Sequence, residues 1–288
     1  MKHAFNILYE VIYMEQKVSL EPWLMDRVLK LATLNKVSLQ FLRIMDLEGK
    51  CKAKEEEEFT KIIKKCEEIS QELRDLDYVF YKFIKPIAYV PADIDILINH
   101  KCVYSAVSRL KQMGFKLKVV EPYCITMNSC EIILDLYIHP NLGGMIYLDG
   151  EELLKHRTVM KFQGIEIPTL KYYAEALVVA AHAIYKECLY TLNDYMTIKK
   201  WMGQRTIRLS EKLKCKSVIK QAIKLNQAVD DGRLELPYRI PIPMWISLLT
   251  QKILKDPLAR STSTNLPKVL ISSRGLMQML SKLTRKTY

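Results

Sequence analysis

The sequence is poor in glycine, and it has no long apolar run at either end or in the middle. Only 9 of its 288 residues are glycine, and together with long stretches of helical periodicity this scarcity predicts a helix-rich protein. The most apolar segment, residues 174–184, contains Glu175 and His182 and is too short to span a bilayer. The first residues lead into charged positions, so we expect no signal peptide and no membrane partner.

The chain also lacks closely spaced cysteines. Its seven cysteines are scattered and include no C-x-x-C pair. Zinc sites and disulfide frameworks need short or regular spacings, so this pattern favours neither of them. We therefore expect free thiols and a cytoplasmic protein, because the cytoplasm keeps thiols reduced. We also find no internal repeat and no extended low-complexity segment.

Positive charge, by contrast, is in excess. The 44 Lys and Arg residues outnumber the 32 Asp and Glu residues, which gives a formal net charge of +12 and an isoelectric point near 9.2. A positive potential attracts nucleic acids, nucleotides or anionic membrane surfaces. A basic protein without a polyanionic partner has the same composition, so charge alone does not identify the partner.

The spacing of apolar residues changes twice along the chain and predicts an α+β protein with three regions. Residues 1–76 are predicted to form a helical N-terminal region. Residues 77–168 contain β-rich segments and predict a mixed sheet with flanking helices, including an antiparallel hairpin of 123–127 with 131–138 around a turn at 128–129. Residues 169–288 return to helical spacing, with Thr169 as the expected N-cap and one amphipathic helix over 205–227.

Two carboxylates share one face of a predicted strand in the middle region. Side chains alternate along a strand, so Ile94, Ile96 and Ile98 point to one face. Asp93 and Asp95 point to the other face, about 7 Å apart along the strand. Their repulsion requires a basic residue, a shared proton or a divalent cation, and Mg²⁺ would leave room for phosphate oxygens. The alternative is a solvated strand end, because D-x-D is short and common.

A third aspartate lies in another predicted strand, residues 131–138. An unpaired carboxylate inside an apolar strand is costly, so Asp135 also needs a partner. If this strand lies near the one that carries Asp93 and Asp95, three carboxylates converge. Such a cluster is sufficient to hold one or two divalent ions for phosphoryl chemistry.

With the D-x-D pair, a third aspartate some forty residues later and a helical C-terminal half, the chain resembles the DNA polymerase beta-type nucleotidyltransferase superfamily. The resemblance covers roughly residues 77–203 and is nearest to small prokaryotic and archaeal members of uncharacterised substrate. It implies an enzyme that moves a nucleoside monophosphate from a nucleoside triphosphate to a hydroxyl acceptor and releases pyrophosphate. It also implies Mg²⁺ or Mn²⁺ as the cofactor, held by Asp93, Asp95 and Asp135.

The chain departs from the family pattern just before D-x-D. Members usually carry a Gly-Ser or Gly-Gly pair about ten residues upstream, where backbone amides approach the phosphates. Here the segment 79–86, Val-Phe-Tyr-Lys-Phe-Ile-Lys-Pro, contains neither glycine nor serine. Lys82 and Lys85 are candidate phosphate contacts as point charges, but they cannot copy a glycine backbone. A catalytically degenerate protein that binds nucleic acid or a protein partner is therefore the alternative.

Four further residues are candidates for substrate binding. His139 opens a glycine-containing loop four residues after Asp135, and the alternative is a solvated histidine in a plain turn. His182, Lys186 and Asp194 fall in the helical pair that follows the catalytic sheet in the resembled family, where they would face the substrate. The alternative is that His182 is a hydrogen-bonded core residue and Asp194 a helix cap.

The end of the chain is strongly basic. The segment 251–288 contains Asp256 as its single acid and eight basic residues: Lys252, Lys255, Arg260, Lys268, Arg274, Lys282, Arg285 and Lys286. It predicts a contact arm for RNA or DNA, with tRNA as one candidate acceptor, or else a solvated basic tail. Within it we expect a polar loop over 260–267 and a last helix over 267–283. A nucleotidyltransferase from a toxin–antitoxin pair would show the same features.

Overall fold

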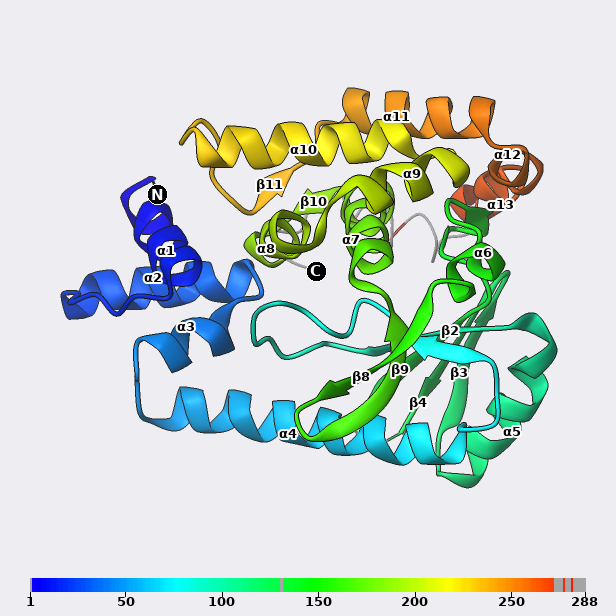
Figure 1. Ribbon diagram of the computed structural model, residues 1–288, viewed down its shortest axis with the longest axis horizontal. Helices are drawn as coiled ribbons and strands as arrows, with labels where there is room; N and C mark the ends of the chain where they lie inside the picture. Colours follow the sequence, from blue (N-terminus) through cyan, green and yellow to red (C-terminus); the bar gives the residue numbers. More distant parts are fainter. Residues whose placement is uncertain (1, 130–131, 272–276, 278–280, 282–288) are drawn as a thin grey trace.

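A seven-stranded mixed sheet has a long helix of the N-terminal region on one face, and on its other side lie the helices of the C-terminal region, with which the first N-terminal helices pack (Figure 1). The computed structural model describes residues 2–129, 132–271, 277 and 281. The predicted α+β class is confirmed, with helices before the sheet and helices after it. Among the described residues, none of the helices combines the length and the apolar character that a membrane span requires.

Four helices form the N-terminal region: α1 Lys2–Met14, α2 Pro22–Leu34, α3 Ser38–Ile44 and α4 Lys50–Glu72. The longest of them, α4, runs along one face of the sheet (Figure 1). It packs there through Phe59, Ile63, Cys66 and Ile69, which belong to the same buried cluster as the inner strands. Their spacing of three and four residues gives α4 a single apolar stripe, and this stripe fixes the helix on the sheet.

The strands of the sheet follow the order β3-β4-β5-β2-β1-β9-β8. Their bounds are β1 Tyr78–Phe80, β2 Ile94–Ile98, β3 Lys116–Glu121, β4 Cys124–Asn128, β5 Ile133–Tyr137, β8 Arg157–Phe162 and β9 Ile165–Leu170. β4 and β5 form the predicted antiparallel hairpin, whereas β2 and β5 are parallel. β2 is buried along its whole length because both faces of this central strand are covered.

The C-terminal region is built around α7 Tyr172–Ala181, which continues into a π-helical turn, His182–Glu187. The helices that follow are α8 Leu192–Trp201, α9 Gln204–Lys212, α10 Lys216–Asp230, α11 Ile242–Lys255, α12 Pro257–Thr262 and α13 Asn265–Ile271. The shorter elements are α5 Val103–Gln112, β6 Asn141–Leu142, β7 Met145–Ile146, α6 Gly150–Leu154, β10 Leu189–Tyr190 and β11 Tyr238–Arg239.

Three predictions about the C-terminal region are wrong. Thr169 does not cap a helix, because it belongs to β9 and pairs with Phe80 of β1. The helix expected over 205–227 is divided into α9 and α10, since the backbone at Lys214 turns to a φ of +54°. The loop expected over 260–267 is largely helical, because α12 begins at a proline after a capping aspartate and α13 follows at once.

The described part of the basic segment packs into the helical region. Lys252 is only 1% exposed, and its ammonium donates to the carbonyl oxygen of Leu213 and pairs with Asp256 at 2.6 Å. Arg260 donates to carbonyl oxygens at the end of α11. Both cations therefore bind carbonyl oxygens of the helical region, Lys252 as a buried group and Arg260 as an exposed one. Most of the predicted last helix lies outside the described residues, as do Arg274, Lys282, Arg285 and Lys286.

A buried asparagine ties the N-terminal region to the C-terminal one. The side-chain amide of Asn35, in the turn after α2, donates to the carbonyl oxygen of Leu236 at 2.9 Å. Its side-chain oxygen accepts from the backbone N–H of Leu192 at 2.9 Å. The carbonyl oxygen of Lys36 accepts from the side chain of Asn193 at 3.0 Å. These bonds fix the turn after α2 against the first residues of α8.

Candidate active site

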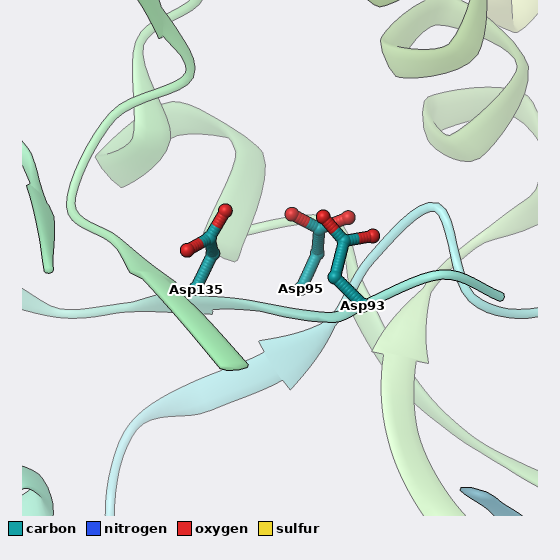
Figure 2. A group of neighbouring side chains, drawn as sticks. All are labelled: Asp93, Asp95 and Asp135. Atoms are coloured by element: carbon teal, nitrogen blue, oxygen red, sulfur yellow. The ribbon is translucent and has the colours of Figure 1, made fainter. Parts of the chain in front are cut away.

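The parallel pairing of β2 with β5 brings the predicted carboxylates together. Asp95 and Asp135 are direct register partners, and Asp93 immediately precedes β2. Figure 2 shows the three side chains rising from neighbouring strands toward a common space. Each offers a carboxylate oxygen within 4.8 Å of the others. Oxygen ligands on opposite sides of a hard divalent ion are about 4–5 Å apart, so one ion can contact all three residues.

Asp135 is held in place by two hydroxyl groups. The Thr126 hydroxyl, from the neighbouring strand β4, donates to its Oδ1 at 2.6 Å. The Tyr137 hydroxyl donates to its Oδ2 at 3.2 Å and itself accepts from the Lys186 ammonium at 2.7 Å. The carboxylate is therefore oriented before any ligand binds, which is the usual role of the groups that surround a metal ligand.

Asp95 is the most deeply buried of the three carboxylates, at 7% exposure. Its pKa is raised to about 7: burial raises it most, the Lys82 ammonium opposes the shift, and the charges of Asp93 and Asp135 support it. Oδ2 of Asp95 lies 2.8 Å from the Lys82 ammonium. Its Oδ1 is buried and has no hydrogen-bond partner among the described residues. A buried carboxylate oxygen without a partner is costly, and a cation would satisfy it.

The donor set fits a hard divalent ion. All three candidate ligands are carboxylates, which Mg²⁺ and Mn²⁺ prefer to nitrogen or sulfur ligands. The unpaired Oδ1 of Asp95 and the short distances among the three side chains meet the requirement for a common ion. Asp93, Asp95 and Asp135 are therefore the residues that would hold the predicted Mg²⁺ or Mn²⁺.

Lys82 enters the carboxylate cluster from the loop that follows β1. Its backbone has a φ of +59°, a left-handed conformation that lysine rarely adopts. The Tyr89 hydroxyl donates to its carbonyl oxygen at 2.7 Å and helps to hold this turn. Burial lowers the pKa of Lys82, but the charges of Asp95 and Asp93 outweigh it and the net shift is upward. The side chain, 12% exposed, is therefore a charged group inside the site.

A cavity of about 160 Å³ opens next to the carboxylates. Asp93 and Asp95 contribute to its wall, and so do most of the residues predicted to bind substrate: Lys82, Lys85, His182, Lys186 and Asp194. Lys36, from the turn after α2, adds a fourth lysine. Three parts of the chain thus form one cavity, in which lysines face a cluster of carboxylates. Such a combination of charges suits a phosphate ligand together with a divalent ion.

His182 and Lys186 project from the π-helical turn after α7. The His182 Nδ1 lies 3.4 Å from the Tyr147 hydroxyl and 3.5 Å from the Lys82 ammonium, while its Nε2 lies 3.4 Å from Glu187. His182 as a whole is only 8% exposed, so it both belongs to a buried polar network and reaches the cavity wall. A π-helical turn places these side chains where a regular α-helix would not, and such turns are frequent at functional sites.

Lys85 faces a buried acid from α7. Its ammonium lies 3.8 Å from Glu175, and the two side chains are 6% and 1% exposed. Burial lowers the pKa of Lys85, and the charge of Glu175 opposes this shift. Burial likewise raises the pKa of Glu175, against the charges of Lys85 and Lys82. This pair sets the charge at the side of the cavity that adjoins α7.

Asp194 and His139 have structural contacts. The Asp194 carboxylate accepts from the backbone N–H and the hydroxyl of Thr191, at 2.9 and 2.7 Å, and so completes the capping box of α8, whose N-cap is Thr191. His139 accepts from the backbone N–H of Gly150 at 2.9 Å, packs against Tyr123, and is not among the residues that line the cavity. Asp194 therefore reaches the cavity as a cap, and we leave His139 out of the proposed site.

Sequence reasoning missed Lys36 and two of the hydroxyl groups that organise the site. Lys36 is far from D-x-D along the chain, and a lysine after a helix end is usually solvated. Thr126 and Tyr137 lie in predicted strands, and they reach Asp135 only through the pairing of β4 with β5 and through side-chain direction. The alternation of the β5 strand was the only signal that pointed to Tyr137.

No known family model and no curated protein sequence matches the chain. Among solved structures it is similar to the lincosamide antibiotic adenylyltransferase LnuA in its lincomycin-bound form. The identity is 18%, the match covers 51% of this chain and 95% of that chain, and the TM-score is 0.35. It is also similar to the antibiotic-resistance factor ANT(2'')-Ia, with 14% identity, coverage of 60% and 91%, and a TM-score of 0.30. Likenesses this low do not establish a shared fold, so we infer function from the site itself.

Proposed function

We propose that the protein is a metal-dependent nucleotidyltransferase that moves a nucleoside monophosphate from a nucleoside triphosphate to a hydroxyl acceptor and releases pyrophosphate. The supporting observation is the carboxylate cluster of Asp93, Asp95 and Asp135 beside a cavity lined by lysines. Carboxylates alone would suit any hard cation, and lysines alone would suit any anion. The two together suit a triphosphate that arrives with a divalent ion.

The chain's own residues account for binding and orientation. Asp93 and Asp95 hold the ion, which when bound neutralises charge that develops on the transferred phosphate. Asp135, oriented by Thr126 and Tyr137, completes the cluster next to the acceptor. The acceptor oxygen forms a bond to the α-phosphorus while the bond from that phosphorus to pyrophosphate breaks, and the proton of the acceptor hydroxyl passes to water.

The lysines stabilise the phosphate groups. Lys186 is placed by its hydrogen bond to Tyr137, and Lys36 and Lys85 lie elsewhere on the cavity wall. Their charges offset the negative charge of the triphosphate before and during the reaction, without any rearrangement of water. His182, in contact with Tyr147 and close to Lys82, would orient the polar groups at this end of the cavity.

A catalytically degenerate protein of the same fold is the second candidate. It would bind nucleic acid or a protein partner. The absence of a Gly-Ser pair before D-x-D supports it, since the backbone cradle for phosphate is missing from the sequence. Among the described cations of the basic segment, Lys252 and Arg260 already bind within the helices, so RNA or DNA would need other contacts. RNA, DNA, protein side chains and small-molecule hydroxyls are all candidate acceptors.

Calorimetry with each nucleoside triphosphate and Mg²⁺ separates the two candidates. The native chain should bind at least one nucleotide, and Asp93→Asn/Asp95→Asn should lose metal-dependent binding. Asp46→Asn is the matched control, because this carboxylate is 70% exposed and lies on the surface. Transfer of labelled nucleotide to a panel of acceptors follows. Undiminished transfer by the double variant would refute the assignment, and steeply salt-dependent nucleic-acid binding without nucleotide binding would favour the degenerate protein.

A further inference from the structure

One cation position in the carboxylate cluster is already filled by the chain itself. The Lys82 ammonium lies 2.8 Å from Oδ2 of Asp95, and the charge of Asp93 also acts on it. A lysine side chain normally keeps its charged end in water, but here only 12% of it is exposed. The ammonium thus takes a place in which a carboxylate-bound metal ion would otherwise be expected.

The two oxygens of Asp95 have different environments. Oδ2 is paired with the Lys82 ammonium, whereas Oδ1 is buried without a hydrogen-bond partner among the described residues. Asp135 differs, because both of its oxygens accept a hydrogen bond from a neutral hydroxyl group. Asp95 therefore has one side satisfied by an internal cation and one side that still requires a cation.

The conformation of the loop after β1 fixes the position of the Lys82 ammonium. Lys82 has left-handed backbone geometry, and its carbonyl oxygen accepts a hydrogen bond from Tyr89. Its ammonium lies 5.0 Å from the centre of the Tyr81 ring and 5.6 Å from that of the Tyr137 ring. Aromatic faces attract a cation at such distances. Lys82 lies in the segment where the resembled family has its glycine-containing pair.

The balance of charge leads to the same conclusion. Three ionised carboxylates, one ammonium and one divalent ion sum to zero. Before the triphosphate adds its own negative charge, a second divalent ion would leave an excess of positive charge, and it would lie within a few ångströms of the ammonium, in a buried place where repulsion is weakly screened.

We propose that the Lys82 ammonium occupies one of the two cation positions of this site, so that the protein binds a single divalent ion together with its nucleotide. The inference rests on the proposed function and changes the predicted role of Lys82 from a phosphate contact to a built-in partner of the metal ion. The ion would bind on the Oδ1 side of Asp95, shared with Asp93 and Asp135.

The test counts Mn²⁺ ions bound in the presence of a saturating nucleoside triphosphate analogue with a methylene bridge between the α- and β-phosphates. Electron paramagnetic resonance measures free Mn²⁺ and also detects spin coupling, which requires two ions at the ~4 Å separation of two-metal sites. The native protein should bind one ion per chain, without spin coupling. Lys82→Met should bind two, with a coupled signal.

Two further variants show whether the number of bound Mn²⁺ ions depends on the Lys82 ammonium itself. Lys82→Gly removes the ammonium and suits the φ of +59°, so it should also bind two ions even if Lys82→Met folds poorly. Lys17→Met is the matched control, because it removes a lysine ammonium that is 61% exposed and pairs with Asp46, away from the cluster. This control should still bind one ion.

Each outcome decides a separate question. Two coupled ions in the native protein would overturn the role of Lys82 and would support the proposed function. A single ion in both Lys82 variants would overturn it as well. If the native protein binds nucleotide analogue but no Mn²⁺, or neither of them, the proposed metal-dependent function fails and the inference fails with it.

Discussion

Protons should compete with the divalent ion for Asp95, so lowering the pH from 8 to 6 should weaken ion binding. The pKa of this carboxyl is raised to about 7, chiefly by burial and also by the neighbouring charges of Asp93 and Asp135, against the opposing charge of Lys82. The ion binds the ionised form, so at pH 6 a proton must leave before the ion can bind. A solvated aspartate, with its pKa near 3.9, would be ionised throughout this range and would give no effect.

The size of the effect follows from the ionised fraction. With a pKa of about 7, about 90% of Asp95 is ionised at pH 8 and about 10% at pH 6. The apparent dissociation constant for Mn²⁺ should therefore rise about tenfold, a loss of about 1.4 kcal/mol in binding free energy. The effect must be a weakening of ion binding at lower pH, because Asp95 takes up a proton as the pH falls through 7.

Calorimetry at five pH values between 6 and 8 measures this dependence. Repeating each titration in two buffers with different ionisation enthalpies gives the number of protons released, which should approach one at pH 6 and zero at pH 8. Asp46→Asn, in which an exposed carboxylate is removed, should show the native dependence. Equal affinity at pH 6 and 8 without proton release would refute the raised pKa. A native pH dependence in Asp95→Asn would assign the proton to another residue.

Three substitutions test the groups that position the site. Asn35→Leu should lower the free energy of unfolding by about 2–4 kcal/mol, because it leaves buried backbone groups without partners; a native midpoint in urea would contradict this. Thr126→Val should weaken Mn²⁺ binding at pH 8 by about 10- to 100-fold, because it removes the 2.6 Å hydrogen bond to Asp135; unchanged calorimetric affinity would show that this bond does not orient the carboxylate. Asp194→Ala should cost about 0.5–2 kcal/mol of unfolding free energy, because it removes the capping-box partner of Thr191, the N-cap of α8, and an unaltered thermal midpoint would count against that role.

Local patterns in the sequence were sufficient to predict the strands that carry the aspartates. The alternation of Ile94, Ile96 and Ile98 predicted β2, and the short turn before β5 predicted its hairpin with β4. Both signals arise within a few residues, where side-chain period and turn geometry decide the conformation. The helical stripe of α4 was predictable for the same reason.

These local patterns do not predict which segments that are distant in the sequence lie side by side in the fold. The register that sets Asp95 beside Asp135 joins strands about forty residues apart, and periodicity does not encode which strands pair. Lys252 lies in the basic segment that predicts exposed contacts with nucleic acid, yet the fold buries it against Leu213 and Asp256. Lys82 was expected at a phosphate, but only the backbone turn shows that it points at Asp95.

The walls of the cavity come from separate stretches of the chain, and this has a consequence for how the protein can vary. The aspartates belong to the sheet, whereas Lys36 and Lys186 come from the helical regions on either side of it. A change in the helices could alter which nucleotide fits without disturbing the carboxylates. A fragment restricted to the sheet would keep every acidic ligand together with Lys82 and Lys85, and it would lose Lys36 and Lys186. Selectivity for the substrate and the capacity to hold an ion are thus encoded in different parts of the gene.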